Sequence, residues 1–319
     1  MQQRTIITIG FVVLFYGAVP AAFGSTDYVI SSIVAALTIA GTAVAWALLG
    51  NLGGMVSFGH AAFFGVGAYV SALLTMNAGW PVFAAIIAGG AGASIASVAI
   101  MPALRLRGPY FALAVLAYAG IFRILATEME GITRGAAGLL SIPRLPTILG
   151  FDLGTNIGSY YVILTIVLAA MAAYAWIRRS EIGFALLAMH ETEDATRILG
   201  VPSTRLKAMM LVLSAFITGI VGAFNAHHIS FLDPDYAFSG VWTVLPIVAA
   251  IFGGFRTVSG PFIGALAIYL LDQFVFKSLL PTGHQIILGA ALGTMILLSP
   301  DGLVPLLGRG LGKKRHAAT

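Results

Sequence analysis

The sequence predicts an all-α fold: a polytopic bundle of about ten transmembrane helices, some of them short or broken, in one membrane domain that spans residues 1–319. Hydrophobic residues make up 59% of the chain, charged residues only 9%, and the mean hydropathy is +0.97. Soluble domains carry roughly 25% charged residues, so this chain has too little polar surface to cover itself in water. The charges also gather in short stretches between long apolar runs, as loops between spans require.

Each crossing of the bilayer needs roughly 20 apolar residues. The predicted spans lie near residues 5–23, 28–50, 55–76, 80–104, 109–128, 159–177, 208–231, 240–255, 261–276 and 284–300. The segment 51–60 is rich in glycine and the segment 256–261 separates two short spans, so whether either one is re-entrant stays open. The run after Arg4 also resembles a secretory signal peptide, and this alternative stays open too.

Basic residues predict the orientation, because Lys and Arg are enriched in cytoplasmic loops. Most of them fall on one set of alternate loops: Arg4, Arg105, Arg107, Arg178, Arg179, Arg197, Arg205, Lys207, Arg256, Arg309, Lys313, Lys314 and Arg315. We therefore expect both termini in the cytoplasm, with 178–207 as a cytoplasmic loop, 301–319 as a cytoplasmic tail and 130–158 as an outer loop. The net charge of +5 is then explained by the basic residues of the cytoplasmic loops, and no nucleic-acid partner is expected.

The loop 178–207 contains one short predicted helix. Thr192 is a suitable N-cap, and Glu193 and Arg197 form a favourable i,i+4 pair. Gly200 can end the helix in the left-handed conformation, and Pro202 prevents its continuation. A helix of about two turns is marginal in water, so it must pack on something.

An apolar face on this helix is formed by Ala195, Ile198 and Leu199. The face suits a groove on a partner protein. It suits equally well an amphipathic connector that lies on the membrane surface, and the residues alone leave both alternatives open.

Several motifs then resemble one family. They are Ser57-Phe58-Gly59-His60-Ala61 within the glycine-rich stretch 51–69, the stretch 104–112, the Gly-Leu pair before Pro143, the loop 181–207, and the stretch 251–261. In this order they resemble the permease subunits of bacterial branched-chain amino acid ABC importers, in particular the M-type subunit.

The resemblance implies a multi-pass permease of the bacterial inner membrane that catalyses no reaction and binds no cofactor or metal itself. ATP and Mg would be bound by two cytoplasmic ATPase subunits, and the other partners would be a homologous second permease and a periplasmic binding protein. It assigns the ATPase-coupling helix to Glu191, Thr192, Glu193, Asp194, Ala195, Ile198, Leu199 and Gly200. Branched-chain amino acids are the implied cargo, but relatives also carry urea and short amides.

Two departures from the family pattern leave the substrate open. Arg134 stands where the family usually carries Gly, and Met55-Val56 replaces a commoner pair of one polar and one apolar residue.

Candidate residues of the translocation path or gate come from the same motifs and from polar groups inside spans: Ser57, Gly59, His60, Gly65, Tyr110 and Arg123. Polar groups in hydrocarbon are costly and usually face a cavity or the bundle interior. Arg123 could contact a substrate carboxylate or extend to the outer headgroups. His60 could lie beside a pore or form a structural hydrogen bond.

Two other function classes are weighed. An ion-coupled secondary transporter would need acids near the centre of a span, and an intramembrane enzyme would need paired catalytic groups at helical spacing; neither pattern is evident. The chain also lacks a Gly-x-x-x-x-Gly-Lys-Ser/Thr motif, so ATP must be hydrolysed by a partner. The pair His190-Glu191 does not predict a zinc protease, because the second His would fall at Asp194.

Overall fold

The computed structural model describes residues 14–24, 26–106, 108–299 and 301–306. Within this part of the chain, seven helical stretches are long and apolar enough to cross a membrane: Asp27–Leu52, His60–Ala78, Pro109–Glu128, Asn156–Arg179, Ser203–Ile229, Pro234–Gly253 and Gly260–Leu279. The predicted polytopic helical bundle is confirmed, and the protein is a multi-pass membrane protein.

The elements in chain order are η1 (Leu14–Ala18), α2 (Val19–Phe23), α3 (Asp27–Ala47), η2 (Leu48–Leu52), α4 (His60–Ala78), α5 (Val82–Val98), η3 (Met101–Arg105), α6 (Pro109–Glu128), α7 (Glu130–Thr133), η4 (Gly135–Ala137), β1 (Leu139–Leu140), β2 (Thr147–Ile148), β3 (Phe151–Asp152), α8 (Asn156–Arg179), α9 (Glu181–Glu191), α10 (Glu193–Ile198), α11 (Ser203–Ile229), β4 (Phe231–Leu232), α12 (Pro234–Ala237), α13 (Val241–Gly253), α14 (Gly260–Leu271), η5 (Asp272–Phe276), α15 (Lys277–Leu279) and α16 (His284–Leu298). The strands form two antiparallel pairs, β1 with β4 and β2 with β3.

Some predicted spans differ in their bounds. The span expected at 80–104 is divided into the 17-residue helix α5 and the 3-10 turn η3, where Pro102 cannot continue the helix ladder. The span expected from residue 55 begins only at His60, because Gly54 is left-handed and the following residues are not helical. Most of the span expected at 5–23 lies outside the described residues, as does most of the tail 301–319.

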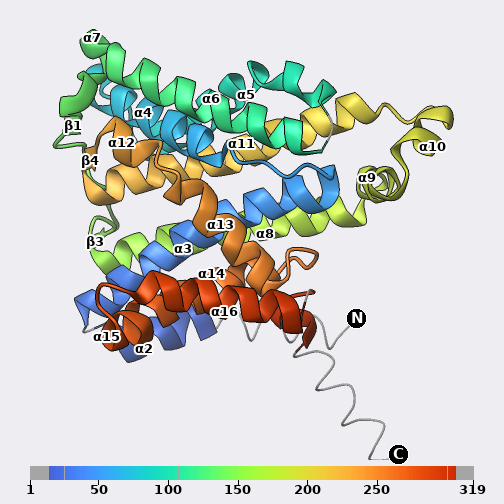
Figure 1. Cartoon of the computed structure of the whole chain (residues 1–319). Helices are drawn as coiled ribbons and strands as arrows, with labels where there is room; N and C mark the ends of the chain where they lie inside the picture. The colour runs from blue at the N-terminus through green and yellow to red at the C-terminus, as the bar shows by residue number, and fades with distance from the viewer. Residues whose placement is uncertain (1–13, 25, 107, 300, 307–319) are drawn as a thin grey trace, which may run out of the picture.

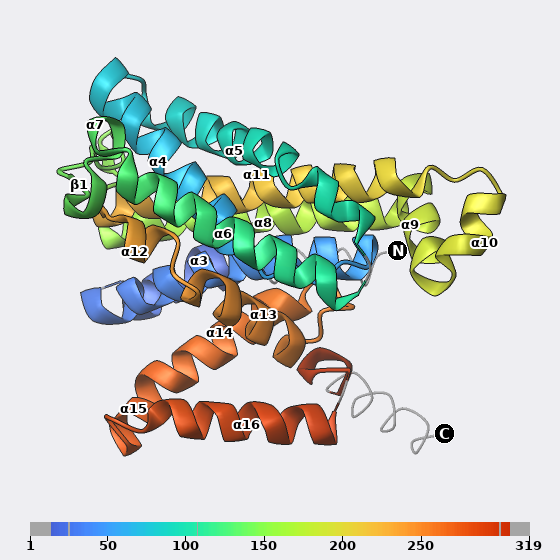
Figure 2. The ribbon, with the colours of Figure 1, turned by 45° about the horizontal axis from the view of Figure 1, so that its top comes forward.

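The helices pack in layers (Figures 1 and 2). Helices α4 and α5 pack on α11, and α6 packs on α4. A second group contains α3, which contacts α8, α13 and α14. The long helices α3 and α11 also touch, so they join the two groups.

Glycines bring the helices of the first group close together. A Cβ on Gly67 would lie 2.2 Å from the carbonyl oxygen of Gly219, and a Cβ on Gly222 would lie 2.1 Å from that of Phe64. Helices in lipid associate through such close backbone contacts, since lipid tails are as apolar as leucine side chains. The glycine-rich sequence therefore serves packing at these positions.

The two ends of the bundle differ. Helices α7 and α12 lie at one end with β1 and β4, whereas α9 and α10 project from the other end (Figures 1 and 2). At the α10 end, Arg105 and Lys207 line one cavity, and the main chain of Arg256 accepts a hydrogen bond from Asn51. Arg105, Lys207 and Arg256 thus lie at the α10 end, and the predicted orientation of this end toward the cytoplasm stays a prediction.

Candidate functional site

A cleft of about 850 Å³ opens at the α10 end of the molecule. Its walls come from three parts of the chain: Gly54, Met55, Val56 and Phe58 before α4; residues 104–106, 108–109 and 111–113 around the start of α6; and Glu193, Thr204 and Lys207 near α10 and the start of α11. These segments are far apart in the sequence. The cleft therefore joins a break in the membrane helices to the loop that projects beyond them.

The helix break between η2 and α4 forms one wall of this cleft. Gly54 has a φ of +65°, and a Cβ on it would lie 2.9 Å from Nδ1 of His190. The indole of Trp46 donates to the carbonyl of Ser57 over 2.9 Å, and the main-chain N–H of Gly59 donates to the Ser57 hydroxyl over 3.3 Å. The break is thus held to α3 on one side and touches α9 on the other.

We call α9 and α10 with the residues up to Gly200 the arm (residues 181–200). In α10, Thr196 is buried and its hydroxyl donates to the carbonyls of Thr192 and Glu193. The next residues point outward: the side chains of Ile198 and Leu199 are 87% and 81% exposed. Two large apolar side chains so exposed at the tip of a projecting loop indicate a docking surface.

The arm ends as the sequence predicts, because Gly200 has a φ of +86°. The Thr192 carbonyl accepts from the N–H of Thr196, which starts the short helix α10. The side chains of Glu191, Asp194, Ala195 and Arg197 lie outside the described part of the structure. The predicted pair of Glu193 with Arg197 therefore stays a prediction.

The structure shows a different partner for Glu193. Nζ of Lys207, in the second turn of α11, donates to Oε2 of Glu193 over 2.7 Å. The side chain of Lys207 is 18% exposed and that of Glu193 is 29% exposed, so the pair is partly shielded from solvent. It ties the arm to α11 at the rim of the cleft.

The predicted path residues do not form one cluster. Ser57 and His60 are fully buried, and Nε2 of His60 lies 3.0 Å from the hydroxyl of Ser214. That hydroxyl donates to the carbonyl of Ala45, so His60 must be the donor to it. His60 thereby joins α4 and α11 inside the bundle, and its predicted place on the translocation path stays a prediction.

The other predicted positions also have clear surroundings. A Cβ on Gly59 would lie 2.2 Å from the side chain of Val115, and one on Gly65 would lie 2.4 Å from the ring of Phe238. Both glycines therefore allow close packing. Tyr110 is 71% exposed at the start of α6, next to residues that line the cleft.

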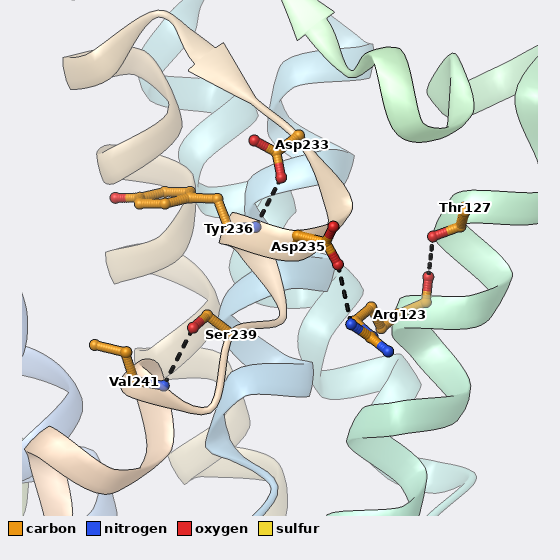
Figure 3. A network of polar contacts seen from close by, with 7 residues as sticks. All are labelled: Arg123, Thr127, Asp233, Asp235, Tyr236, Ser239 and Val241. Carbon is orange, nitrogen blue, oxygen red and sulfur yellow. Dashed lines mark hydrogen bonds and ion pairs between the residues drawn. The ribbon is translucent and has the colours of Figure 1, made fainter.

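Arg123 lies at the opposite end of α6 from Tyr110. Its Nη1 atom donates to Oδ1 of Asp235 in α12 over 3.0 Å (Figure 3). Neither group is buried. This places Arg123 in an ion pair on the surface of α6 and not in the core of the bundle.

No group of three or more His, Asp or Glu side chains within the described residues could hold a metal ion. The adjacent pair His227 and His228 diverges. His227 bridges the carbonyl of Pro143 and the hydroxyl of Ser71, whereas His228 stacks on Phe224.

Comparison with known proteins decides the family. Residues 28–298 match the family described as the permease component of branched-chain amino acid transport systems. The chain belongs to this family.

Individual members of this permease family are similar along most of the chain. LivM, the high-affinity branched-chain amino acid transport system permease protein of Escherichia coli K12, is 29% identical over 297 residues, which cover 84% of this chain and 68% of that protein. LivM of Salmonella typhimurium is 29% identical over 285 residues, 80% of this chain and 65% of that protein. LivH of Escherichia coli K12 is 25% identical over 287 residues, 84% of this chain and 91% of that protein. The chain thus spans about two thirds of the LivM proteins, and no solved structure matches it.

In this permease the departure at Arg134 has a structural consequence. Arg134 adopts a φ of +62° at the end of α7, a conformation that glycine takes without strain. The turn is held by the Thr133 hydroxyl, which donates to the carbonyls of Ala126 and Met129 and accepts from the N–H of Gly135.

Several residues of the permease site were not predicted from the sequence. His190 contacts the helix break at Gly54, Lys207 pairs with Glu193 of the arm, and Val56 lines the cleft. Asp235 pairs with Arg123. Only Asp235 lies in a recognisable local pattern, Asp233-Pro234-Asp235, which marks a helix start. The other three depend on contacts between distant segments.

Proposed function

We propose that this chain is a membrane-spanning permease subunit of an ATP-driven, binding-protein-dependent importer of branched-chain amino acids or related small polar solutes. The observation that carries the proposal is the arm, whose tip presents Ile198 and Leu199 to a partner beside the cleft. The names of the LivM and LivH relatives support the amino-acid cargo and a pair of homologous permeases.

The partners follow from the same reasoning. Two cytoplasmic ATPase subunits bind ATP and Mg and dock on the arm, a second homologous permease completes the pathway, and a periplasmic binding protein delivers the solute. This chain catalyses no reaction itself. The whole chain forms one permease domain of about ten helices in the bacterial inner membrane, with both termini, 178–207 and 301–319 in the cytoplasm and 130–158 outside.

The contacts of the arm suggest how it acts on the pathway. Displacement of the arm by the ATPases moves His190 against Gly54 and strains the pair of Glu193 with Lys207. Both contacts border the cleft, so its width changes with the position of the arm. The ATPase thereby shifts the equilibrium between two states of the permease. The coupling free energy equals the difference between the free energies with which the ATPase binds those two states.

The ion-coupled alternative is not favoured by the buried residues. None of the fully buried polar residues in the described part of the chain is Asp, Glu, Lys or Arg. An ion-coupled carrier places such groups at its coupling site near the midplane. Urea and short amides remain possible cargo within the same family.

Uptake by the reconstituted complex tests the function. The chain is co-expressed with its second permease, ATPases and binding protein, and the purified complex is placed in vesicles. We expect radiolabelled L-leucine to enter only with ATP on the ATPase side and loaded binding protein on the other. Uptake that persists without ATP and collapses with an ionophore would contradict the proposal.

Sidedness is tested by single thiols, since the chain contains no cysteine. Leu199→Cys lies on the arm and Leu149→Cys lies in the 130–158 stretch, and both leucines are exposed. We expect an impermeant maleimide to label Leu199→Cys only from the cytoplasmic side and Leu149→Cys only from outside. Labelling of both positions from one side would overturn the topology.

A further inference from the structure

The outer half of α6 carries a charged pair that faces away from the bundle. Oδ1 of Asp235 lies 3.0 Å from Nη1 of Arg123, and the two side chains are 85% and 53% exposed. Figure 3 shows Asp235 reaching from α12 toward α6. Arg123 belongs to the membrane-spanning stretch Pro109–Glu128, one and a half turns before its end.

A charged pair in this position is unsuited to contact with lipid. Charged side chains within membrane spans face a bundle interior, a partner or a water-filled cavity, because hydrocarbon does not solvate them. Around Arg123, Gly120 is exposed and no atom lies within 4 Å of a Cβ built on it, while Leu116 and Ile124 are 50% and 57% exposed. It is the charged pair, and not the apolar residues beside it, that requires water or a second protein chain.

The fold of α12 does not depend on Asp235. The N-cap of α12 is Asp233, whose Oδ1 accepts from the N–H of Tyr236 over 2.8 Å (Figure 3). Likewise the hydroxyl of Thr127 donates to the main-chain carbonyl of Arg123, a bond that does not involve the guanidinium. The fold thus fixes where the two charged groups lie, but neither group caps the helix that carries it.

A pocket of about 230 Å³ surrounds the pair. Ile124, Pro234 and Ala136 supply apolar walls, and Thr127 and Glu128 supply polar ones. This volume is below the range of pockets for drug-sized ligands and suits a small solute. It offers one cation (Arg123), two carboxylates (Asp235 and Glu128) and an aliphatic surface within one space.

An α-amino acid carries a carboxylate and an ammonium group on one carbon atom, with its side chain beside them. A guanidinium binds carboxylates in a fixed planar geometry, and a carboxylate such as Asp235 accepts from an ammonium group. An exposed ion pair joined by a single contact contributes little to stability, so it opens at low cost. Each member can then bind the opposite charge of the ligand.

We propose that Arg123 and Asp235 form an outer binding site for the zwitterionic head of an α-amino acid, whose aliphatic side chain lies against Ile124 and Pro234. This inference rests on the proposed function, because it requires that an amino acid passes along α6. The site lies at the end of the molecule opposite the cleft beside the arm, so α6 borders both ends of the pathway.

Protection of a single thiol tests the site in the complete complex. Ile124→Cys places the only cysteine of this chain in the pocket, and Ile132→Cys is the matched control, since Ile124 and Ile132 are 57% and 51% exposed and Ile132 does not line the pocket. An impermeant maleimide is applied from the outer side, and the label is measured on this chain alone. L-leucine is compared with leucinamide, which lacks the carboxylate, and with 4-methylpentanoate, which lacks the ammonium group.

We expect saturating L-leucine to slow the labelling of Ile124→Cys at least fivefold, the single-charge analogues to have less than a twofold effect, and Ile132→Cys to be unaffected. Arg123→Ala or the isosteric Asp235→Asn, added to Ile124→Cys, should remove the protection. The proposal is overturned if Ile124→Cys is not labelled, or if leucine and leucinamide act alike.

Leucine uptake by the same complex separates the two hypotheses. An unprotected Ile124→Cys in a complex that imports leucine contradicts the site and leaves the proposed function standing. Protection by leucine in a complex that imports no leucine supports the site and contradicts the proposed function.

Discussion

The imidazole of His190 lies against Gly54, with Nδ1 2.9 Å from where a Cβ would stand on that glycine. His190 belongs to the projecting arm, whereas Gly54 belongs to the break in the membrane helices. No other residue type fits at Gly54 without change, because its φ of +65° is left-handed and the space for a side chain is filled. The contact joins the arm to the break in the membrane helices.

Substitution of this glycine should uncouple the permease. Gly54→Ala forces a left-handed alanine, which costs roughly 1–2 kcal/mol, and pushes His190 away. We expect leucine uptake and binding-protein-stimulated ATP turnover to fall roughly tenfold, the factor that 1.4 kcal/mol represents. Both rates are measured in vesicles that contain the whole complex.

Two controls separate strain from the contact. Gly79→Ala also forces a left-handed alanine, with a φ of +64°, but nothing lies within 4 Å of its Cβ and it does not line the cleft. Gly53→Ala has ordinary backbone angles and meets mainly the flexible end of Met55. Equal losses in Gly54→Ala and Gly79→Ala would show that the contact with His190 carries no coupling.

The ion pair at the rim of the cleft should matter for coupling. Lys207→Met leaves the carboxylate of Glu193 partly shielded and without this cation, which is unfavourable. We expect a several-fold fall in stimulated ATP turnover, and a substantial recovery in the exchange Glu193→Lys with Lys207→Glu. Lys277→Met is the control, because Lys277 lies 3.9 Å from Asp272, outside the arm and the cleft. An equal fall in that control would contradict a specific role for the pair.

The exposed tip of the arm should hold the ATPase. Leu199→Asp replaces an exposed apolar side chain with a charge that an apolar groove must desolvate, which costs well over 1 kcal/mol if Leu199 is a central contact. We expect the ATPase subunits to be lost on co-purification while the second permease is retained. Leu149→Asp is the matched control at the other end, where the leucine is also fully exposed. Retention of the ATPase by Leu199→Asp would place the docking surface elsewhere.

The strained arginine at the end of α7 should be replaceable with a gain in stability. Arg134→Gly removes a left-handed side-chain residue and should stabilise the permease by about 1 kcal/mol. Arg134→Ala keeps the strain and should give no such gain. Thermal unfolding in detergent measures both, and a destabilised Arg134→Gly would show that the arginine side chain makes a compensating contact.

The sequence predicted the membrane helices more completely than the residues of the candidate site. The apolar runs predicted the membrane helices well, because an uninterrupted run must span or be buried wherever its neighbours lie. Gly200 was predicted as a left-handed end, since the following Pro202 and the short helix are local features. The helix α9 was not predicted as a separate element, because its apolar composition resembles the membrane segment before it.

The role of His60 shows why the site was less predictable. A histidine among small residues is compatible with a pore or with a helix contact, and the sequence offers no means to choose. The structure pairs it with Ser214, which lies 154 residues away in the chain. Such a pairing follows from the way helices pack across the whole bundle.

The amino-acid sequence alone determined that this protein is a membrane-embedded helical bundle and that a short helix, followed by the left-handed Gly200, lies between two of its long helices. These properties depend on local composition and local backbone chemistry. Only the tertiary structure decided that His190 rests on Gly54, that Lys207 pairs with Glu193 and that Asp235 meets Arg123. Each of these contacts joins two different elements of the fold. Helix packing brings these elements together, and the choice of packing partner leaves no periodic signal in the sequence.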